Sequence, residues 1–522
     1  MHEPWWKAAV IYQVYPRSFA DSDGDGVGDL EGLRSHLDHL VWLGVDGVWL
    51  SPIYRSPMAD FGYDISDHCD VDPVFGTLAD ADRVVAEAHE RGLKVLLDWV
   101  PNHTSDQHPW FLASRSSRTD PQRPWYVWRD GGPDGSPPNR WASAFVEPPE
   151  WVLDEVTGER RRGPDPVAAG RHQGTAWTFD EATGQWYLHL FLPQQPDLEW
   201  REPAVEEAMH DVLRFWLDRG IDGFRADVIH ALGKSPDEGE PTDHPYVHEL
   251  IRRIRSVLDS YDGDRVMVGE VFILDTARVA EYYGGGDELH LAFNFSPLFA
   301  PWKAEAWRTR IEELEKHFIP RQAWPTWVLS NHDQPRHRTR YGSERRARAA
   351  AVLLLGLRGT PFLYAGEELG LEDAVIPPWR RLDPGGRDGC RAPLPWTPEA
   401  GHGWGASPWL PFPPDAAARS VEAMREDEGS ILHLYRRLLA ARKGSPALQL
   451  GDLELLEGPE GVVVWMRARD GDRRLVAVNF GTAADLAVEG RWSVEVASDG
   501  AGEGQPFDGR IGADTAVVLR PA

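Results

Sequence analysis

The chain has 522 residues, of which 42% are hydrophobic and 26% charged, so it can bury a large core and is not a disordered protein. Its 55 Lys and Arg against 83 Asp and Glu give a net charge of −28, which repels nucleic acid and anionic lipid, and we expect neither as a partner. Two cysteines, Cys69 and Cys390, exclude a disulfide framework.

The N-terminal segment lacks the basic and apolar stretches of a secretory signal. The longest apolar run, Ala349 to Leu357, is about half as long as a membrane span needs. We therefore expect a cytoplasmic protein. The 24 tryptophans exceed what burial alone needs; most are expected in the core, and some suit stacking on ring surfaces.

Short runs of apolar, β-branched or aromatic residues predict eight strands, at 10–14, 47–50, 95–98, 223–227, 266–270, 291–294, 327–330 and 361–364. Helical periodicity lies between them: Leu33, Leu37 and Leu40 share one helix face, as do Val205, Met209 and Trp216. Strands that alternate with helices indicate a parallel sheet, and eight of them indicate a (β/α)₈ or TIM barrel.

Two stretches depart from this alternation. Residues 104–175 are rich in Pro, Gly, Arg and Trp with little periodicity, which indicates a subdomain inserted after the third strand. After a helical pattern at 431–443, short strand-like runs separated by Gly- and Asp-rich turns predict a C-terminal antiparallel β-domain. We thus expect a barrel in two parts, 1–103 and 176–444, an insertion at 104–175 and a β-domain at 445–522.

Carboxylates follow several predicted strands: Asp98, Asp227, Glu270 and Asp333. An acidic residue after a strand is often only a helix cap or a solvated loop residue. In a barrel, however, the C-terminal ends of the strands meet at one mouth. Converging carboxylates suit glycoside hydrolysis, in which one attacks or stabilises the anomeric carbon and a protonated one donates to the leaving oxygen. A catalytic metal held by carboxylates and histidine is an alternative that fits less well.

Four segments resemble sequence regions of the α-amylase superfamily, glycoside hydrolase family 13, and occur in that family's order. They are 98–103 (Asp-Trp-Val-Pro-Asn-His), 223–230 (Gly-Phe-Arg-Ala-Asp-Val-Ile-His), 269–272 (Gly-Glu-Val-Phe) and 329–333 (Leu-Ser-Asn-His-Asp). The resemblance implies that Asp227 is the nucleophile, Glu270 the general acid/base and Asp333 the residue that distorts and stabilises the bound sugar. It also implies that Arg225 pairs with Asp227, and that Asp98, His103 and His332 contact the glucosyl unit.

The implied mechanism retains the anomeric configuration through a glucosyl-enzyme intermediate, with the nucleophile and acid carboxyls about 5–5.5 Å apart and no organic cofactor. Segments 11–19 and 195–198 resemble the α-glucosidase and oligo-1,6-glucosidase branch of the family. In that branch Tyr63, Asp64 and Arg391 line a blind pocket, where an aromatic ring stacks on the terminal glucose and an Asp–Arg pair binds its far hydroxyls. Without the resemblance, Tyr63 would be interpreted as a packed loop residue.

These features predict an exo-acting, retaining α-glucosidase that removes terminal non-reducing α-linked glucose from maltose-like and short oligosaccharides. An oligo-1,6-glucosidase, or a transglycosylase or isomerase of the same family (trehalose synthase-like or sucrose-cleaving), is an alternative. Val228 resembles the α-1,6-preferring members, whereas Glu199 and the segment 391–395 depart from the usual pattern of the branch, so the linkage stays open. A non-catalytic sugar-binding homologue is less consistent with a chain that keeps all three carboxylates.

An acidic loop at 21–29 predicts a calcium site. Asp21, Asp23, Asp25 and Asp29 stand at positions 1, 3, 5 and 9 of an EF-hand-like loop, and Val27 at position 7 would offer its carbonyl. The bidentate Glu of position 12 is missing, since residue 32 is Gly, and a metal-free acidic turn is the alternative. The α-glucosidase branch has a similar loop that resembles a structural Ca²⁺ site far from catalysis.

Overall fold

All eight predicted barrel strands are present in one parallel sheet of the computed structural model, which describes the chain except residues 1–2, 146–150, 154–159, 163–173 and 406. In sheet order they are β13 (Leu291–Ala292), β12 (Val266–Gly269), β11 (Gly223–Ala226), β5 (Lys94–Trp99), β2 (Gly47–Leu50), β1 (Ile11–Val14), β15 (Thr360–Tyr364) and β14 (Thr326–Val328). These strands are buried nearly throughout, as expected for the centre of a TIM barrel.

The barrel is closed by a side chain where β13 and β14 meet. The hydroxyl of Thr326 donates to the carbonyl of Ala292 (2.8 Å) and accepts from the amide of Asn294 (3.2 Å). These two bonds join the strands at the ends of the sheet order, so the predicted barrel is confirmed.

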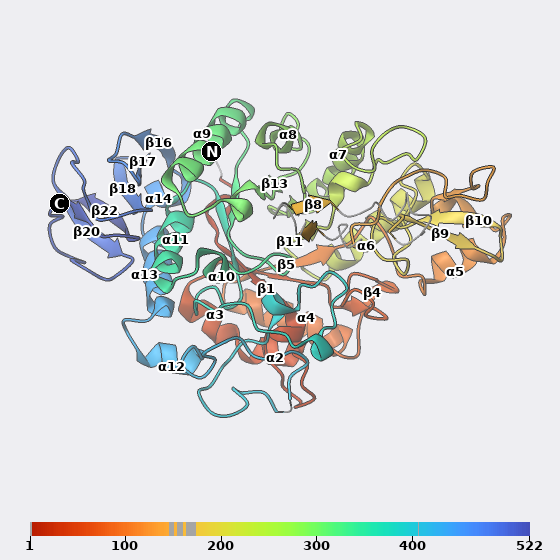
Figure 1. Ribbon diagram of the computed structural model, residues 1–522, viewed down its shortest axis with the longest axis horizontal. Coiled ribbons are helices and arrows are strands. Elements are labelled where there is room, and N and C mark those ends of the chain that lie inside the picture. Colours follow the sequence, from red (N-terminus) through yellow and green to blue (C-terminus); the bar gives the residue numbers. More distant parts are fainter. Residues whose placement is uncertain (1–2, 146–150, 154–159, 163–173, 406) are drawn as a thin grey trace.

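Helices follow the strands and surround the sheet (Figure 1). The longer ones are α4 (Leu78–Glu90), α6 (Pro203–Asp218), α7 (Tyr246–Asp259), α9 (Ala304–Phe318) and α11 (Glu344–Gly356). Helix α6 buries the predicted stripe of Val205, Met209 and Trp216. The helix predicted around Leu33 to Leu40 is two helices, α2 (Leu30–Ser35) and α3 (Leu37–Leu43), because the backbone of His36 between them leaves the helical region.

The inserted subdomain extends farther along the chain than predicted. It contains α5 (Pro109–Ser116), β6 (Trp128–Arg129) and a hairpin, β7 (Trp151–Leu153) and β8 (Arg160–Arg162). Strand β10 (Gln185–Leu188) pairs with β6 on one side and with β9 (Trp177–Asp180) on the other, so the boundary predicted at residue 175 precedes two strands that belong to the insertion. The antiparallel pairing of Trp186 and Tyr187 with both neighbouring strands assigns this segment to the insertion.

The C-terminal domain is an antiparallel sheet at the opposite end of the molecule from the insertion (Figure 1). Helices α13 (Ile431–Lys443) and α14 (Pro446–Leu450) precede β16 (Asp452–Leu456), β17 (Val462–Arg469), β18 (Asp472–Asn479), β22 (Ala516–Pro521) and β20 (Trp492–Ala497), in sheet order. The indole of Trp465 and the guanidinium of Arg467 both donate to the carbonyl of Gly356 at the end of α11 (3.0 Å each). None of the described helices has the length and apolar composition that a bilayer crossing requires.

Two adjacent glutamates, Glu367 and Glu368 in the turn that follows β15, are buried inside the fold. The hydroxyl of Tyr12 donates to Glu368 (2.7 Å), and that of Tyr435 donates to Glu367 (3.2 Å). Burial raises the pKa of Glu367 to about 8 and that of Glu368 to about 7, and mutual repulsion contributes to the increase for Glu367. Hydrogen bonds to the carboxylates oppose it.

We expect this pair to make the protein less stable as the pH rises from about 5 to about 8. In the unfolded chain both carboxyls lose their protons near the ordinary Glu pKa of 4.5, whereas in the native state they keep them to higher pH. The stabilisation present at low pH is therefore lost between about pH 5 and about pH 8. Each carboxyl adds at most about 1.4 kcal/mol per pH unit.

Thermal melting of the double variant Glu367→Gln/Glu368→Gln should depend less on pH than melting of the wild type. Glu313→Gln, on the exposed face of α9, is the matched control and should keep the wild-type dependence. Equal pH dependence in the double variant and the wild type would contradict the assignment.

Candidate active site

One guanidinium group contacts three carboxyls at the mouth of the barrel. Arg225 Nη1 is 2.8 Å from Asp98 and also contacts Asp227, and its Nη2 is 2.8 Å from Glu270. Strand β11 lies between β5 and β12, with Arg225 paired to Asp98 in register, so an arginine on the central strand reaches acids from both neighbours. All four side chains are buried.

The charges of this cluster do not balance when all its acids are ionised. Burial raises the pKa of Asp98 to about 6, against the effect of Arg225. Burial likewise raises the pKa of Asp227; Arg225 opposes this shift, and Glu270 and Asp98 add to it. One cation facing three carboxyls favours a proton shared within the group. The arrangement can therefore provide one protonated acid beside an ionised carboxylate.

A strained backbone turn directly after Asp227 connects this residue to Glu270. Val228, directly after Asp227, has φ of 36°, a left-handed conformation that β-branched residues rarely adopt. Its amide donates to the carboxylate of Glu270 (2.9 Å). The turn at Val228 thus orients the Glu270 carboxylate toward the carboxyl of Asp227.

Asp333 lies in a network with His332, Tyr63 and two arginines. Burial alone would raise its pKa, but the adjoining His332 ring and the positive charges of Arg387 and Arg391 lower it well below the ordinary range, so Asp333 is ionised at neutral pH. Burial lowers the pKa of His332 to about 3, so this imidazole is neutral. The ring of Tyr63 stacks on it with 2° between the planes.

The hydroxyl of Tyr63 bridges two of the predicted site residues. It lies 2.6 Å from His332 Nε2 and donates to Asp98 (3.0 Å). The other ring nitrogen of His332, Nδ1, lies 2.8 Å from the side-chain nitrogen of Gln13. The tyrosine thereby links the Arg225 cluster to the Asp333 side of the site.

The Asp–Arg pair in the pocket is Asp60 with Arg387, and not the predicted Asp64 with Arg391. The guanidinium of Arg387 donates to Asp60 (2.6 Å) and to Asp333 (3.0 Å), and Asp383 holds it from behind. Both Asp60 and Arg387 line the cavity. They lie four residues from the predicted pair, in the same two loops.

Asp64 and Arg391 support the pocket from behind. The Asp64 carboxylate accepts from the hydroxyl of Ser56 and from the amides of Ala59 and Asp60 (2.9 Å each), so it fixes the loop that presents Asp60. Arg391 is fully buried; it donates to the carbonyl of His332 (2.8 Å) and reaches Asp333 at 3.2 Å. The sequence prediction of substrate contact for these two residues is corrected accordingly.

Gln195 is a further site residue whose role the sequence did not show. Its side-chain nitrogen donates to Asp60 (3.0 Å) and lies 3.1 Å from His103 Nε2. Burial lowers the pKa of His103 to about 4, so this ring is neutral. The segment 195–198 was noted only for its resemblance, and these contacts place its glutamine between Asp60 and His103.

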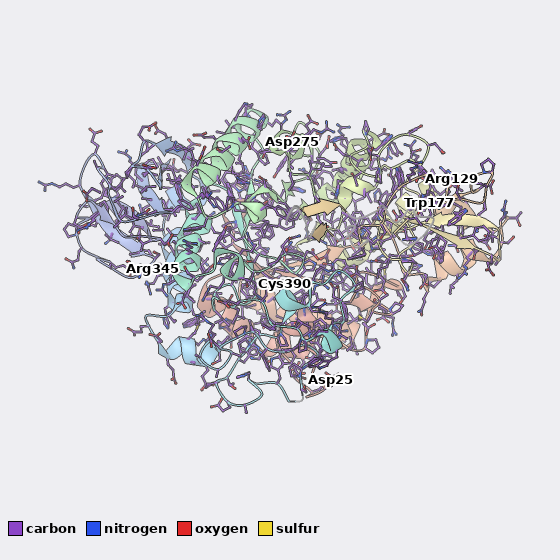
Figure 2. All side chains as sticks on the ribbon, in the orientation of Figure 1. Asp25, Arg129, Trp177, Asp275, Arg345 and Cys390 are labelled. Carbon is purple, nitrogen blue, oxygen red and sulfur yellow. The ribbon has the colours of Figure 1, made fainter. Side chains whose placement is uncertain are left out.

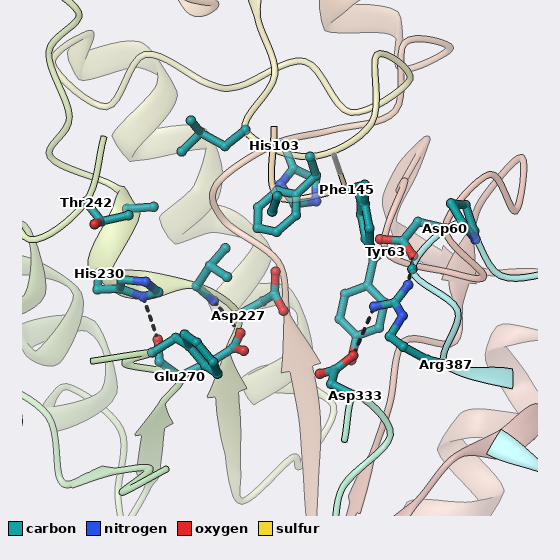
Figure 3. A pocket seen from close by; sticks show the side chains of 18 of the residues that line it. Asp60, Tyr63, His103, Phe145, Asp227, His230, Thr242, Glu270, Asp333 and Arg387 are labelled. Atoms are coloured by element: carbon teal, nitrogen blue, oxygen red, sulfur yellow. Dashed lines mark hydrogen bonds and ion pairs between the residues drawn. The ribbon is translucent and has the colours of Figure 1, made fainter. Parts of the chain in front are cut away.

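The cavity that these residues line has a volume of about 650 Å³. Figure 3 shows Asp60, Tyr63, Arg387 and Asp333 on one side of Asp227, and His230, Thr242 and Glu270 on the other. Of the predicted residues, Asp227, Glu270, Asp333, Tyr63, His103 and His332 line the cavity, whereas Asp98 and Arg225 lie beneath it. The structure therefore brings the predicted catalytic residues to one pocket.

The acidic loop lies at the edge of the molecule in the view of Figure 2, which labels Asp25 there and Cys390 near the middle. Asp21, Asp23 and Asp29 each offer a carboxylate oxygen within 4.8 Å of the others. Gly26 allows the sharp turn with φ of +92°, and its amide donates to Asp21 (3.0 Å). Asp25 instead accepts from the amide of Val27 (2.7 Å) and lies outside this group.

Comparison with known proteins gives one consistent result. Residues 13–451 match the family model described as the α-amylase catalytic domain. The chain is 39% identical to a probable α-glucosidase of Rhizobium meliloti (92% of this chain, 90% of the relative) and 35% identical to an oligo-1,6-glucosidase of Parageobacillus thermoglucosidasius (92% and 91%). The solved α-glucosyl transfer enzyme XgtA superimposes with a TM-score of 0.88 at 38% identity, over 100% of both chains. The family predicted from the sequence is confirmed, and this chain belongs to the α-amylase family.

Proposed function

We propose that the protein is an exo-acting, retaining α-glucosidase that hydrolyses terminal α-linked glucose from short oligosaccharides. The observation that carries the proposal is the contact of Arg225 with both Asp227 and Glu270, beside a pocket in which Arg387 joins Asp60 to Asp333. Relatives named α-glucosidase and oligo-1,6-glucosidase support it. Small α-glucosides are the proposed substrates, and location in the cytoplasm stays a prediction from the sequence.

The mechanism requires one ionised carboxylate and one protonated acid, which the carboxyl cluster around Arg225 can provide. Asp227, ion-paired with Arg225, attacks the anomeric carbon while Glu270 donates its proton to the leaving oxygen. Glu270 then takes a proton from water while the water oxygen bonds to C1 and the bond between C1 and Asp227 breaks. Asp227 leaves as a carboxylate, and glucose is released with retained configuration. Asp333, kept ionised by its arginines, binds hydroxyls of the sugar and stabilises the developing positive charge.

Exo action follows from the Asp60–Arg387 ion pair, which closes the inner end of the pocket. Asp60 and Arg387 come from loops 327 residues apart and meet at 2.6 Å across the cavity wall. The carboxylate and the guanidinium can each bind a hydroxyl on the far side of the terminal glucose. A chain extended at that end would break the ion pair, so the pocket accepts only a terminal unit.

Transfer of the glucosyl group to an acceptor other than water is the second candidate. The similarity to a solved α-glucosyl transfer enzyme favours it. Hydrolysis and transfer share the glucosyl-enzyme. They differ only in the second step, in which Glu270 takes a proton from water in hydrolysis and from the hydroxyl of an acceptor in transfer. Val228, directly after the nucleophile, resembles the α-1,6-preferring members, so both α-1,6 and α-1,4 linkages stay candidates for cleavage.

Proton NMR with maltose and isomaltose in parallel tests the main proposal. We expect α-glucose to appear first from at least one of them, because a double displacement retains the configuration. Asp227→Asn should lose at least about 10³-fold in kcat, since it removes the nucleophile. Early β-glucose, or undiminished turnover by Asp227→Asn, would contradict the mechanism, and the ratio of initial rates identifies the preferred linkage.

A comparison of Asp60→Asn with Asp64→Asn tests the inner pair. Asp60→Asn should lower kcat/KM by about 10-fold or more, since it removes an ionised partner of the sugar and of Arg387. Asp64→Asn, which keeps an acceptor oxygen for the loop amides, should affect mainly thermal stability. A larger loss of kcat/KM in Asp64→Asn than in Asp60→Asn would restore the original assignment.

We also propose that the loop at 21–29 binds a structural Ca²⁺. Three carboxylates with oxygens within 4.8 Å of one another suit a hard cation, and their repulsion is costly without one. Asp21, Asp23 and Asp29 are the proposed side-chain ligands, and contributions from Asp25 and the Val27 carbonyl stay predictions. Asp29 also caps α2 by accepting from the amide of Gly32 (2.6 Å), so an ion here would stabilise the start of that helix.

Chelation should lower the melting temperature by a few degrees, and added Ca²⁺ should restore it, because an ion that binds only the native state stabilises it by mass action. Asp21→Asn should melt lower and respond less to chelator. Asp38→Asn, on the exposed surface of α3, is the matched control and should respond as the wild type does. An unchanged melting curve after verified removal of metal would contradict a structural calcium.

A further inference from the structure

The inserted subdomain carries a second cavity, with a volume of about 640 Å³. Most of its described lining comes from the segment 118–129, and Gln185 on β10 and Glu199 complete it. The described linings of this cavity and of the catalytic pocket have no residue in common. A cavity of this size can hold a small-molecule ligand, so we consider which chemistry its lining suits.

Three arginines line this second cavity, although the protein as a whole has a net charge of −28. Figure 2 labels one of them, Arg129, on the inserted subdomain. Arg129 pairs with Asp237 (3.0 Å) and Arg118 with Asp130 (3.4 Å), and both aspartates are exposed. Ion pairs between exposed side chains contribute little, so both guanidinium groups can turn to a bound anion.

The third arginine, Arg123, is a buried cation without a carboxylate in ion-pair distance among the described residues. It is 7% exposed, and its guanidinium lies 3.5 Å from the centre of the Trp128 ring. It donates to the carbonyl of Ser114 (3.0 Å), the hydroxyl of Thr183 (3.2 Å) and the side-chain oxygen of Gln185 (2.6 Å), and its buried Nε has no hydrogen-bond partner. These acceptors are neutral, so an anion in the cavity would supply the missing counter-charge.

Two half-buried carboxylates on the lining also lack a cation in ion-pair distance within the described chain. Asp120 accepts from the amide of Gln122 (2.8 Å), and Glu199 accepts from the amide of Arg201 (3.1 Å). Each carboxylate keeps lone pairs that can accept from hydroxyl groups of a ligand. The same carboxylates repel a bare anion, so the lining as a whole suits a ligand that carries both an anionic group and hydroxyls.

We propose that this cavity binds a phosphorylated sugar, with the phosphate at the three arginines and ring hydroxyls at Asp120 and Glu199. Arginine forms charge-assisted and often bidentate hydrogen bonds with phosphate oxygens, and three guanidinium groups match a dianion. A sugar phosphate satisfies both halves of the lining, whereas inorganic phosphate or a neutral sugar satisfies only one. The ligand thus differs in charge from the neutral α-glucosides that are the proposed substrates.

Two chain segments connect this cavity to the catalytic pocket. Glu199 ends the segment in which Gln195 contacts His103 (3.1 Å). The hydroxyl of Tyr126, which lines the second cavity, lies 2.7 Å from Oγ1 of Thr104, the residue after His103. A ligand in the second cavity therefore lies against the backbone that presents Gln195 and His103 to the sugar, and we expect its binding to change the KM for oligosaccharides.

Isothermal titration calorimetry of the full-length enzyme tests the site, with glucose 6-phosphate, inorganic phosphate and glucose as separate titrants. Glucose 6-phosphate should bind about 10-fold more tightly than phosphate, because its hydroxyls add hydrogen bonds. Arg118→Gln should weaken glucose 6-phosphate about 10-fold, since a charge-assisted bond is lost. The same variant should leave glucose binding unchanged, because glucose is the product of the proposed reaction and binds in the catalytic pocket.

Three further variants separate the two halves of the site from general damage. Glu199→Ala should weaken glucose 6-phosphate about fivefold without weakening phosphate, because it removes an acceptor of hydroxyls and a repelling charge. Arg123→Gln should weaken both titrants; its melting temperature is measured alongside, since Arg123 also bonds to the interior. Arg214→Gln, a surface arginine on α6 outside the lining, is the matched control and should bind as the wild type does.

Absence of glucose 6-phosphate binding at millimolar concentration would overturn the inference and leave the proposed function standing. Binding that glucose displaces and that Arg118→Gln and Arg123→Gln leave unchanged would place the ligand in the catalytic pocket and would also overturn it. Equal affinity for phosphate and glucose 6-phosphate would overturn the sugar half of the site. An effect of glucose 6-phosphate on KM that disappears in Arg118→Gln would support the connection to the catalytic pocket, and an unchanged KM in the wild type would contradict it.

Discussion

The charge balance around Arg225 is the constraint on which the site depends. Three carboxyls from neighbouring strands are buried together, and such an arrangement is costly unless a cation is buried with them. The sheet order provides this cation on β11, which lies between β5 with Asp98 and β12, which Glu270 follows. One positive charge leaves room for a proton, and a shared proton is what an acid beside a nucleophile requires. The chemistry is thus set by strand order as much as by residue type.

The sequence predicted the parts of the site that lie on strands. Apolar runs located the eight strands, and the carboxylates at 98, 227 and 270 followed from their ends, because a barrel brings these ends together. It did not predict the Asp60–Arg387 pair, although both loops were identified. Asp60 and Asp64 are spaced as Arg387 and Arg391 are, and only the packing of one loop on the other decides which member faces the cavity.

The same limit applies to the insertion and to the acidic loop. Periodicity identifies the barrel helices and strands in the sequence, whereas β9 and β10 are assigned to the insertion by pairing: β10 pairs with β6 across more than 50 residues, and β9 pairs with β10. In the acidic loop, regular spacing suggested four equivalent aspartates. The turn at Gly26 separates Asp25 from the other three, since its amide and that of Val27 take different carboxylates as partners. Local spacing predicted the residues, and hydrogen bonds of the backbone select among them.

The two sides of the pocket have different origins in the chain, and this bears on how specificity can change. The sugar side is assembled from distant loops, so a substitution at Asp60 or Arg387 disturbs Asp333 as well. The leaving-group side follows the catalytic residues directly: Val228 and His230 come after Asp227, and Phe272 comes after Glu270. The backbone amide of Val228 donates to the Glu270 carboxylate, and the His230 ring contacts the Glu270 carbonyl. Substitutions in these two short segments can alter the acceptor while the glucosyl site and its charge balance stay intact.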